Sequence, residues 1–220
     1  MHTNHLHTFS ILYEDDSILV VNKPAGLMVE PDRNGHPNLL QQVKRYLKNS
    51  LKEEVYAQHI HRLDRSVSGI VLFAKQRAVL KNLSEQFAER KVKKYYQALT
   101  AKAPALKNGT LEHWHRKEKK KAMLFETQEA YTEKAQLDYE VSKDGDLFLW
   151  NIQLHTGKYH QIRAQLASVG CPIHGDSLYG SQEQYYENAI ALDAFELIFN
   201  HPLTNAELRM TSNNLLKYKS

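Results

Sequence analysis

Cysteine is almost absent from this 220-residue chain, in which Cys171 stands alone. A single cysteine excludes an intrachain disulfide framework and any zinc site built from several cysteines. Such sparing use of cysteine suits a reducing compartment, so the sequence predicts a cytoplasmic protein.

Long apolar runs are missing as well. No stretch approaches the roughly 18–20 apolar residues that a helix needs to cross a bilayer, so we expect no membrane association. The first ten residues, MHTNHLHTFS, lack the basic region and apolar stretch of a secretory signal. Their three histidines could form a weak metal site, but a polar tail is the better interpretation of residues 1–10.

Repeats, low-complexity segments and Gly/Ser-rich or Pro-rich linkers are also absent. Hydrophobic residues make up 42% of the chain and charged residues 25%, as in ordinary globular proteins. The length is sufficient for a substantial core. Residues 11–220 are therefore predicted to form a single domain.

The positive charge is modest overall but unevenly placed. The formal net charge is +4, and the sequence pI is about 8.9. Basic residues gather at 90–94 and again at 116–121, where five of six positions are Arg or Lys. A polyphosphate partner would select such clusters, although a solvated surface without a partner explains them equally well. The run Lys117–Lys121 could be a folded surface or a mobile loop.

The pattern of apolar residues predicts a mixture of strands and helices. Strands are expected in 11–22, 68–74, 95–100 and 189–199, with a turn at 23–26. A hairpin is expected from 136–142 and 146–155 around Lys143-Asp144-Gly145. Helices are expected after Asn38 as N-cap, over 77–90, and over 159–169 with Gly170 as the C-terminal cap. Hairpins alongside helices favour an α+β fold with a mixed, largely antiparallel sheet and flanking helices.

Asp64 lies in the first of three segments that could carry chemistry, His61-Arg62-Leu63-Asp64-Arg65-Ser66-Val67-Ser68-Gly69. An arginine beside this carboxylate would keep it ionised, as a nucleophile must be. Taken alone, the pattern is more typical of a surface Asp–Arg pair.

The other two segments are Lys94-Tyr95-Tyr96-Gln97-Ala98 and Thr156-Gly157-Lys158-Tyr159-His160-Gln161-Ile162-Arg163. Tyr95 and Tyr96 should point to opposite faces of a strand, and a strand tyrosine often serves only core packing. The basic residues of the third segment crowd the first turns of an expected helix, where phosphate or carboxylate groups bind readily.

Together and in this order, the three segments resemble the RluA family of pseudouridine synthases. That family carries HRLD-x-x-[ST]-S-G, K-x-Y-x-A and T-G-[RK]-x-H-Q-I-R segments. The resemblance extends to Asn22-Lys23-Pro24-Ala25-Gly26, to PIHGDSLYG at 172–180 and to LIFNHP at 197–202. Four residues depart from it: Val67 and Tyr159 replace usual threonines, and Glu30 and Asp193 stand where His is common.

The resemblance implies an isomerase that converts uridine to pseudouridine in RNA after base flipping. The reaction needs no redox change or hydrolysis, so no cofactor or metal is expected. The family's pattern makes Asp64 the nucleophile, Arg163 its ion-pair partner, and Tyr96 a residue over the target base or sugar. The implied fold is a pseudouridine-synthase-like sheet with a central RNA-binding cleft.

The resemblance also implies RNA contacts. Arg62 could fill the gap left by the flipped base, since a guanidinium plane stacks on bases; a structural salt bridge is the alternative. Lys23 and Lys158 would contact phosphates, whatever the RNA sequence. Contacts from Arg65, His160 and Gln161 are expected as well.

Many relatives carry an additional N-terminal S4-type RNA-binding domain, for which we expect no room here. The predicted partner is therefore a compact structured RNA, a tRNA or 23S rRNA stem-loop, bound by a monomer. Two other readings stay open: a non-catalytic RNA-binding protein on the same scaffold, and a hydrolase. A hydrolase would want clustered or paired carboxylates, and none stands at a recognisable spacing.

Overall fold

A computed structural model of the chain describes residues 8–51, 55–214 and 216. These residues form two compact units. The chain leaves the first unit after Val92 and returns to it at Ala194, so residues 93–193 make up most of the second unit. Of the expected N-terminal tail, residues 1–7 lie outside the described residues.

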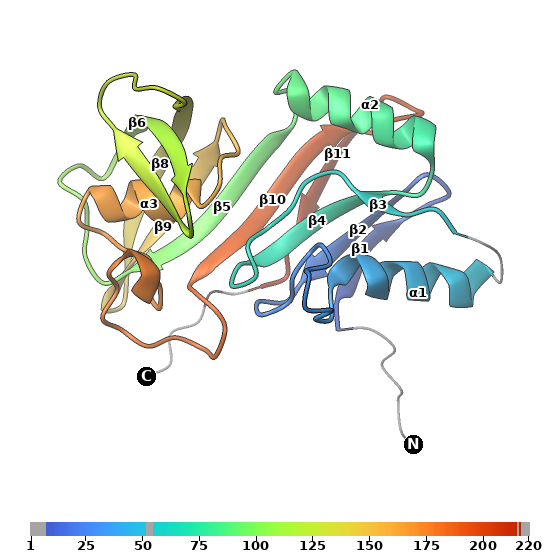
Figure 1. The fold of residues 1–220 in the computed structure, drawn as a ribbon, viewed down its shortest axis with the longest axis horizontal. Coiled ribbons are helices and arrows are strands. Elements are labelled where there is room, and N and C mark those ends of the chain that lie inside the picture. Colours follow the sequence, from blue (N-terminus) through green and yellow to red (C-terminus); the bar gives the residue numbers. More distant parts are fainter. Residues whose placement is uncertain (1–7, 52–54, 215, 217–220) are drawn as a thin grey trace. The chain divides into compact units, whose positions relative to one another are not determined.

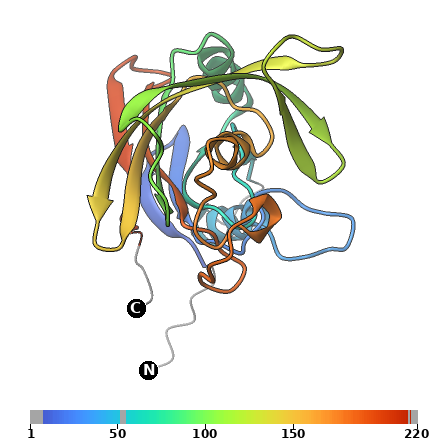
Figure 2. The ribbon, with the colours of Figure 1, turned by 90° about the vertical axis from the view of Figure 1, so that its left-hand side faces the viewer.

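The first unit is built on a sheet with strand order β1-β2-β4-β10, and β3 and β11 pair with β4 and β10. The pairs β1/β2, β2/β4, β3/β4 and β10/β11 are antiparallel. The two helices of this unit lie on one side of its sheet (Figures 1 and 2). The strands are β1 (Ser10–Glu14), β2 (Ile18–Lys23), β3 (Gln58–His59), β4 (Ser68–Ala74), β10 (Leu192–Asn200) and β11 (Glu207–Thr211).

Helix α1 (Leu39–Leu51) begins where the sequence predicts. The Asn38 side-chain oxygen accepts a hydrogen bond from the backbone N–H of Gln41 at 3.0 Å, as an N-cap should. Helix α2 (Arg77–Ala88) turns Val79 and Leu83 inward. They join a core made largely of β2 and β4 side chains, so the apolar face of the helix packs against the sheet.

The second unit holds an antiparallel sheet in the order β5-β9-β8-β6-β7. Trp150, fully buried on β9, donates its indole N–H to the hydroxyl of Thr100 at 2.8 Å. Helix α3 (Gln161–Ser168) packs against β6 and β7, and a short 3-10 turn, η1 (Ser177–Tyr179), follows. The strands are β5 (Lys93–Thr100), β6 (Asn108–Glu118), β7 (Lys121–Phe125), β8 (Glu133–Asp144) and β9 (Leu147–Leu154).

The sheets and helices confirm the predicted α+β class. Several boundaries differ from expectation by one to three residues; for example, α2 ends at Ala88 rather than 90 and β10 begins at Leu192 rather than 189. Two of the differences have a clear physical cause. The β8–β9 turn is Gly145-Asp146 rather than 143–145, because Gly145 supplies the positive φ of 59° at its first position. Helix α3 begins at Gln161 rather than Tyr159, because His160 adopts a left-handed conformation.

The basic run Lys117–Lys121 belongs to a folded hairpin. Lys117 lies on β6, Lys121 opens β7, and Lys119 turns the chain with φ of 50°. The pair Glu118↔Lys121 closes the ladder beside this turn. The sequence left a folded surface and a mobile loop open, and the structure shows a folded hairpin.

Candidate active site

Asp64 lies in the first unit, on the segment between β3 and β4. Buried Leu63 and Val67 flank it and anchor the segment in the protein. The backbone N–H of Val67 donates to the Asp64 carbonyl at 3.1 Å, which closes a turn around Arg65 and Ser66. Asp64 itself is half-buried. A short turn between two buried anchors holds this carboxylate in a defined position.

The Asn-Lys-Pro-Ala-Gly turn braces the Asp64 segment. Gly26 donates its N–H to the Arg65 carbonyl at 2.7 Å, and Arg65 returns a bond from Nε to the Gly26 carbonyl at 3.0 Å. The buried ammonium of Lys23 donates to the carbonyls of Pro24 at 3.0 Å and Leu27 at 2.8 Å. Lys23 and Arg65 therefore stabilise the loop that carries Asp64, and their RNA contacts stay predictions.

Arg62 contacts Glu30, a residue that the sequence reasoning did not assign to the site. Nη1 of Arg62 lies 3.0 Å from a Glu30 oxygen, and His59 Nε2 lies 2.9 Å from the other. Burial raises the pKa of Glu30, but the His59 hydrogen bond and the Arg62 charge outweigh it and lower the pKa below its usual range. The Glu30 carboxylate is therefore negatively charged and holds the Arg62 side chain by an ion pair in this structure.

The first motif ends with Gly69, and the structure shows why a glycine is required at this position. Its φ is 116°, and a Cβ atom there would lie 2.5 Å from backbone atoms of Ala194. No larger residue fits this close approach of two backbones. The glycine thus lets β4 start immediately after the Asp64 turn.

Tyr96 lies in the second unit, on β5 opposite Ile152 of β9, and is 9% exposed. Its neighbour Lys94 reaches the third motif, because a Cβ atom placed on Gly157 would lie 3.4 Å from Lys94 Nζ. The second and third motifs are therefore adjacent within this unit.

Arg163 forms a buried, two-pronged ion pair with Asp176. Nε and Nη2 of the arginine lie 2.7 Å and 2.9 Å from the two carboxylate oxygens. The guanidinium carbon lies 5.2 Å from the centre of the Tyr179 ring. This bidentate geometry fixes the plane of the guanidinium. Asp176 and Tyr179 both lie in the Gly-Asp-Ser-Leu-Tyr-Gly stretch, and the sequence alone assigned a role to neither. In the structure both residues contact Arg163.

Gln161 is a buried structural residue of the third motif. Its side-chain oxygen accepts hydrogen bonds from the Thr156 hydroxyl at 2.8 Å and the Lys158 N–H at 3.0 Å. Its nitrogen donates to the Gln136 carbonyl and to Gln165. These bonds shape the turn before α3, and the predicted contact of Gln161 with RNA stays a prediction.

His160 and Lys158 also have partners within the second unit. His160 stacks on Tyr159, and its Nδ1 lies 3.1 Å from the Tyr179 hydroxyl. Lys158 pairs with Glu133, and this hydrogen bond together with the lysine charge lowers the pKa of Glu133. Both residues lie at the start of α3 as expected, and their RNA contacts remain predictions.

Two residue clusters thus emerge. The first unit gathers Lys23, Arg62, Asp64 and Arg65, and the second gathers Lys158, His160, Gln161 and Arg163, with Tyr96 on β5. Among the described residues, no group of three or more His, Cys, Asp or Glu is placed to hold a metal ion. No helix in the described part of the chain is long and apolar enough to cross a membrane.

Comparison with known families decides what these clusters belong to. A family model described as RNA pseudouridylate synthase matches residues 17–168, more than half of the chain. The chain belongs to the RNA pseudouridylate synthase family. The resemblance to RluA-type synthases is thereby confirmed, and the expected class, an RNA uridine isomerase, agrees with it.

Relatives in this family include an RNA pseudouridine synthase, YhcT, of Bacillus subtilis. It is 32% identical over 199 residues, covering 89% of this chain but 65% of its own length. A relative from Aquifex aeolicus, 31% identical, is likewise covered over 65% of its length. The chain therefore spans about two thirds of these relatives. The dual-specificity RNA pseudouridine synthase RluA of Escherichia coli is 32% identical, with 87% of both chains covered.

Solved structures of this family share the fold. Human RNA Pseudouridylate Synthase Domain Containing 4 superposes with a TM-score of 0.76 at 24% identity, covering 93% of this chain and 88% of its own. Human RNA Pseudouridylate Synthase Domain Containing 1 gives the same TM-score at 23% identity, covering 97% and 86%. These likenesses confirm the predicted pseudouridine-synthase-like fold.

Proposed function

We propose that this chain isomerises uridine to pseudouridine in structured RNA, with Asp64 as the nucleophile. The observation that carries the proposal is the family membership, together with the presence of all three motif residues. Asp64 stands on a braced turn, Tyr96 on a buried strand position, and Arg163 in a bidentate pair.

The reaction breaks the bond between uracil N1 and ribose C1′ and joins C5 to C1′. The C5 proton is lost and N1 gains one, so atoms and electrons balance without an oxidant, a reductant or water. A single carboxylate nucleophile can carry this exchange through a covalent intermediate. We propose that Asp64 starts the reaction, with Arg163 as its ion-pair partner and Tyr96 over the target base or sugar.

The target base must leave the RNA stack to be reached. Extrusion requires a few kcal/mol, and less for a base already in a loop. We propose that Arg62 occupies the vacated position. Its ion-pair partner Glu30 is a surface contact, with side chains 60% and 41% exposed, and such pairs are readily exchanged for RNA.

We propose a tRNA or a 23S rRNA stem-loop as the substrate. The name of the Escherichia coli relative, a dual-specificity enzyme, supports testing both RNAs. We further propose that the protein acts as a cytoplasmic monomer without a cofactor and binds RNA in a central cleft.

The test is direct detection of product. Unmodified tRNA and 23S rRNA transcripts are incubated with the purified protein and a chelator, digested to nucleosides, and separated by chromatography. The proposal predicts pseudouridine in at least one transcript, undiminished by the chelator. Binding of both transcripts without any pseudouridine would favour a non-catalytic RNA-binding protein, and loss of activity with chelator would favour a metal-dependent reaction.

A further inference from the structure

Tyr131 is the most exposed large hydrophobic side chain of the described residues, with 93% of its surface accessible. No hydrogen bond or ring contact joins this side chain to another described residue. It lies in the loop between β7 and β8, outside the three motifs that carry the proposed chemistry. A single exposed aromatic residue is common on a protein surface, so its role must be argued from the backbone and the charges around it.

The backbone at Tyr131 is strained. Its φ is 61°, a left-handed conformation that a bulky aromatic residue seldom adopts. Tyr131 is the third residue of a turn closed by a hydrogen bond from Thr132 N–H to the Glu129 carbonyl at 3.2 Å. Turns with a positive φ at this position normally place Gly or Asn there. Strain of this kind persists only where the surroundings enforce it.

The surroundings of Tyr131 do enforce it. The Thr132 hydroxyl donates to the Glu129 carbonyl at 2.6 Å and accepts from the Glu129 N–H at 3.1 Å. From β6, Arg116 donates from Nη1 to the Ala130 carbonyl at 3.0 Å. The same guanidinium packs over the Phe125 ring at 4.8 Å. These bonds hold the backbone of the turn in place, so the Tyr131 side chain leaves the turn in a fixed direction toward solvent.

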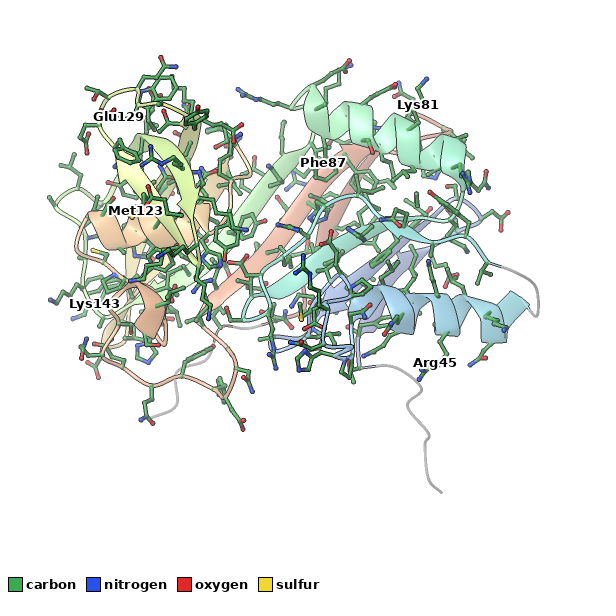
Figure 3. All side chains as sticks on the ribbon, in the orientation of Figure 1. Arg45, Lys81, Phe87, Met123, Glu129 and Lys143 are labelled. Carbon is green, nitrogen blue, oxygen red and sulfur yellow. The ribbon has the colours of Figure 1, made fainter. Side chains whose placement is uncertain are left out.

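The turn adjoins the basic β6–β7 hairpin. Arg116 contacts the turn through Ala130 and also bonds Glu118 near the hairpin tip through Nε at 3.0 Å. The hairpin carries five cationic residues and one carboxylate within 116–121. Strand β8 begins at Glu133 opposite His115, so the turn continues the ladder beside this basic stretch. Figure 3 shows Glu129 and Lys143 at opposite ends of β8.

We propose that Tyr131 is a stacking platform for an unpaired base of the RNA, an inference that rests on the proposed function. The lysines of the hairpin attract the phosphate backbone, and the exposed ring stacks on a base in an RNA loop. Aromatic rings beside basic grooves bind single-stranded nucleic acids in this way. The exposed carboxylates of Glu126 and Glu129 repel phosphate, so the ring meets a base rather than the backbone.

The test compares variants at this position by fluorescence anisotropy. The probes are a labelled RNA stem with a seven-nucleotide loop, the same stem as a blunt duplex, and the loop with single abasic sites. Tyr131→Gly removes the ring and suits the positive φ, Tyr131→Phe keeps the ring, and Leu106→Ala removes another exposed apolar side chain of the same unit. The thermal midpoint of each variant is measured in parallel.

Tyr131→Gly should weaken binding to the looped RNA about fivefold or more, and leave binding to the duplex unchanged. Its thermal midpoint should equal or exceed that of the wild type, because glycine relieves the strain. Tyr131→Phe and Leu106→Ala should bind as the wild type does. One abasic position should weaken the wild type but not Tyr131→Gly.

Wild-type affinity of Tyr131→Gly for the looped RNA would overturn the inference, and a contact with a protein would then be the better explanation of the ring. An equal loss on loop and duplex would also overturn it. Pseudouridine formation by the wild type separates the two proposals. If the wild type forms pseudouridine but RNA binding does not depend on Tyr131, only this inference is wrong. If loop binding depends on Tyr131 but no pseudouridine forms, only the proposed function is wrong.

Discussion

Arg163 is held in one orientation by its neighbours. The residue is 7% exposed, and the bidentate bond to Asp176 satisfies two donors in a buried place. A buried charge without its partner is strongly destabilising. Asp176 is therefore a positioning residue for Arg163, and the stability of the second unit depends on it.

Asp176→Asn should lower the free energy of unfolding by about 3 kcal/mol, since an amide offers one oxygen where Arg163 needs two charged acceptors. Urea denaturation measures this. Asp138→Asn is the matched control, because Asp138 pairs with His155 at a more exposed site and should lose less than about 1 kcal/mol. Equal, small losses for both variants would show that the buried pair contributes little.

Glu30 pairs with Arg62, so under the proposed role of Arg62 we expect Glu30 to compete with RNA for this arginine. Glu30→Gln removes a negative charge that neighbours the predicted RNA-binding arginine, so the KM for RNA should fall about twofold to fivefold at low salt, with kcat nearly unchanged. Steady-state kinetics at two salt concentrations measure this. Glu196→Gln, which frees Arg209 in the same unit, is the control and should leave KM unchanged. A rise in KM for Glu30→Gln would mean that Glu30 orients Arg62 for RNA instead.

Among the elements, those with a regular apolar pattern could be predicted from sequence. Helix α1 has its Asn38 cap, and β4 is an uninterrupted apolar run. The β6–β7 hairpin was not predicted as strands, because its polar sequence shows no regular alternation of apolar and polar residues. Its strands are defined by the pairing of β6 with β7 and β8, and such pairing cannot be read from a local window of sequence.

For the site, the sequence supplied the positions of Asp64, Tyr96 and Arg163 through the family resemblance. It could not supply their partners. Glu30 stands 32 residues before Arg62, and Asp176 stands 13 residues after Arg163, so both contacts depend on the tertiary fold. Lys23 illustrates the same limit, because its burial beneath a turn cannot be inferred from its charge.

The β1–β2 turn carries a polar cluster with a pH dependence of its own. Burial raises the pKa of Asp15, but hydrogen bonds from Ile18, Ser17 and Tyr13 outweigh it and hold the pKa well below its usual range. The same carboxylate lies 2.8 Å from His201 Nε2. His201 Nδ1 accepts backbone N–H groups from Leu203 and Thr204, so Nε2 carries the proton toward Asp15. Asp15 thus ties two turns of the first unit together.

A pKa lowered on folding contributes stability above the unfolded value, about 3.9 for Asp, and this stability is lost as the pH falls below it. Asp15→Asn should therefore be less stable than the wild type at pH 7 by about 1–3 kcal/mol. The difference should shrink when urea denaturation is repeated near pH 3. If the difference in the free energy of unfolding does not change with pH, the charge of Asp15 does not contribute to stability and only its hydrogen bonds do.

At the scale of the whole molecule, the proposed catalytic residues come from both compact units. Asp64 belongs to the first unit, and Tyr96 and Arg163 belong to the second. The division between the units falls after Val92, before Ala194 and after Asn214, so neither unit is a continuous stretch of sequence. We therefore predict that neither unit alone is active.

The central claim is that the Asp64 carboxylate carries the isomerisation, and tritium release from RNA labelled at uracil C5 tests it most directly. Wild-type protein should release tritium, because C5 loses its hydrogen when it bonds to C1′. Asp64→Asn should be slower by about a thousandfold or more while still binding RNA. Asp144→Asn, at the exposed β8–β9 turn, should match the wild type. Release by Asp64→Asn at the wild-type rate would contradict the account.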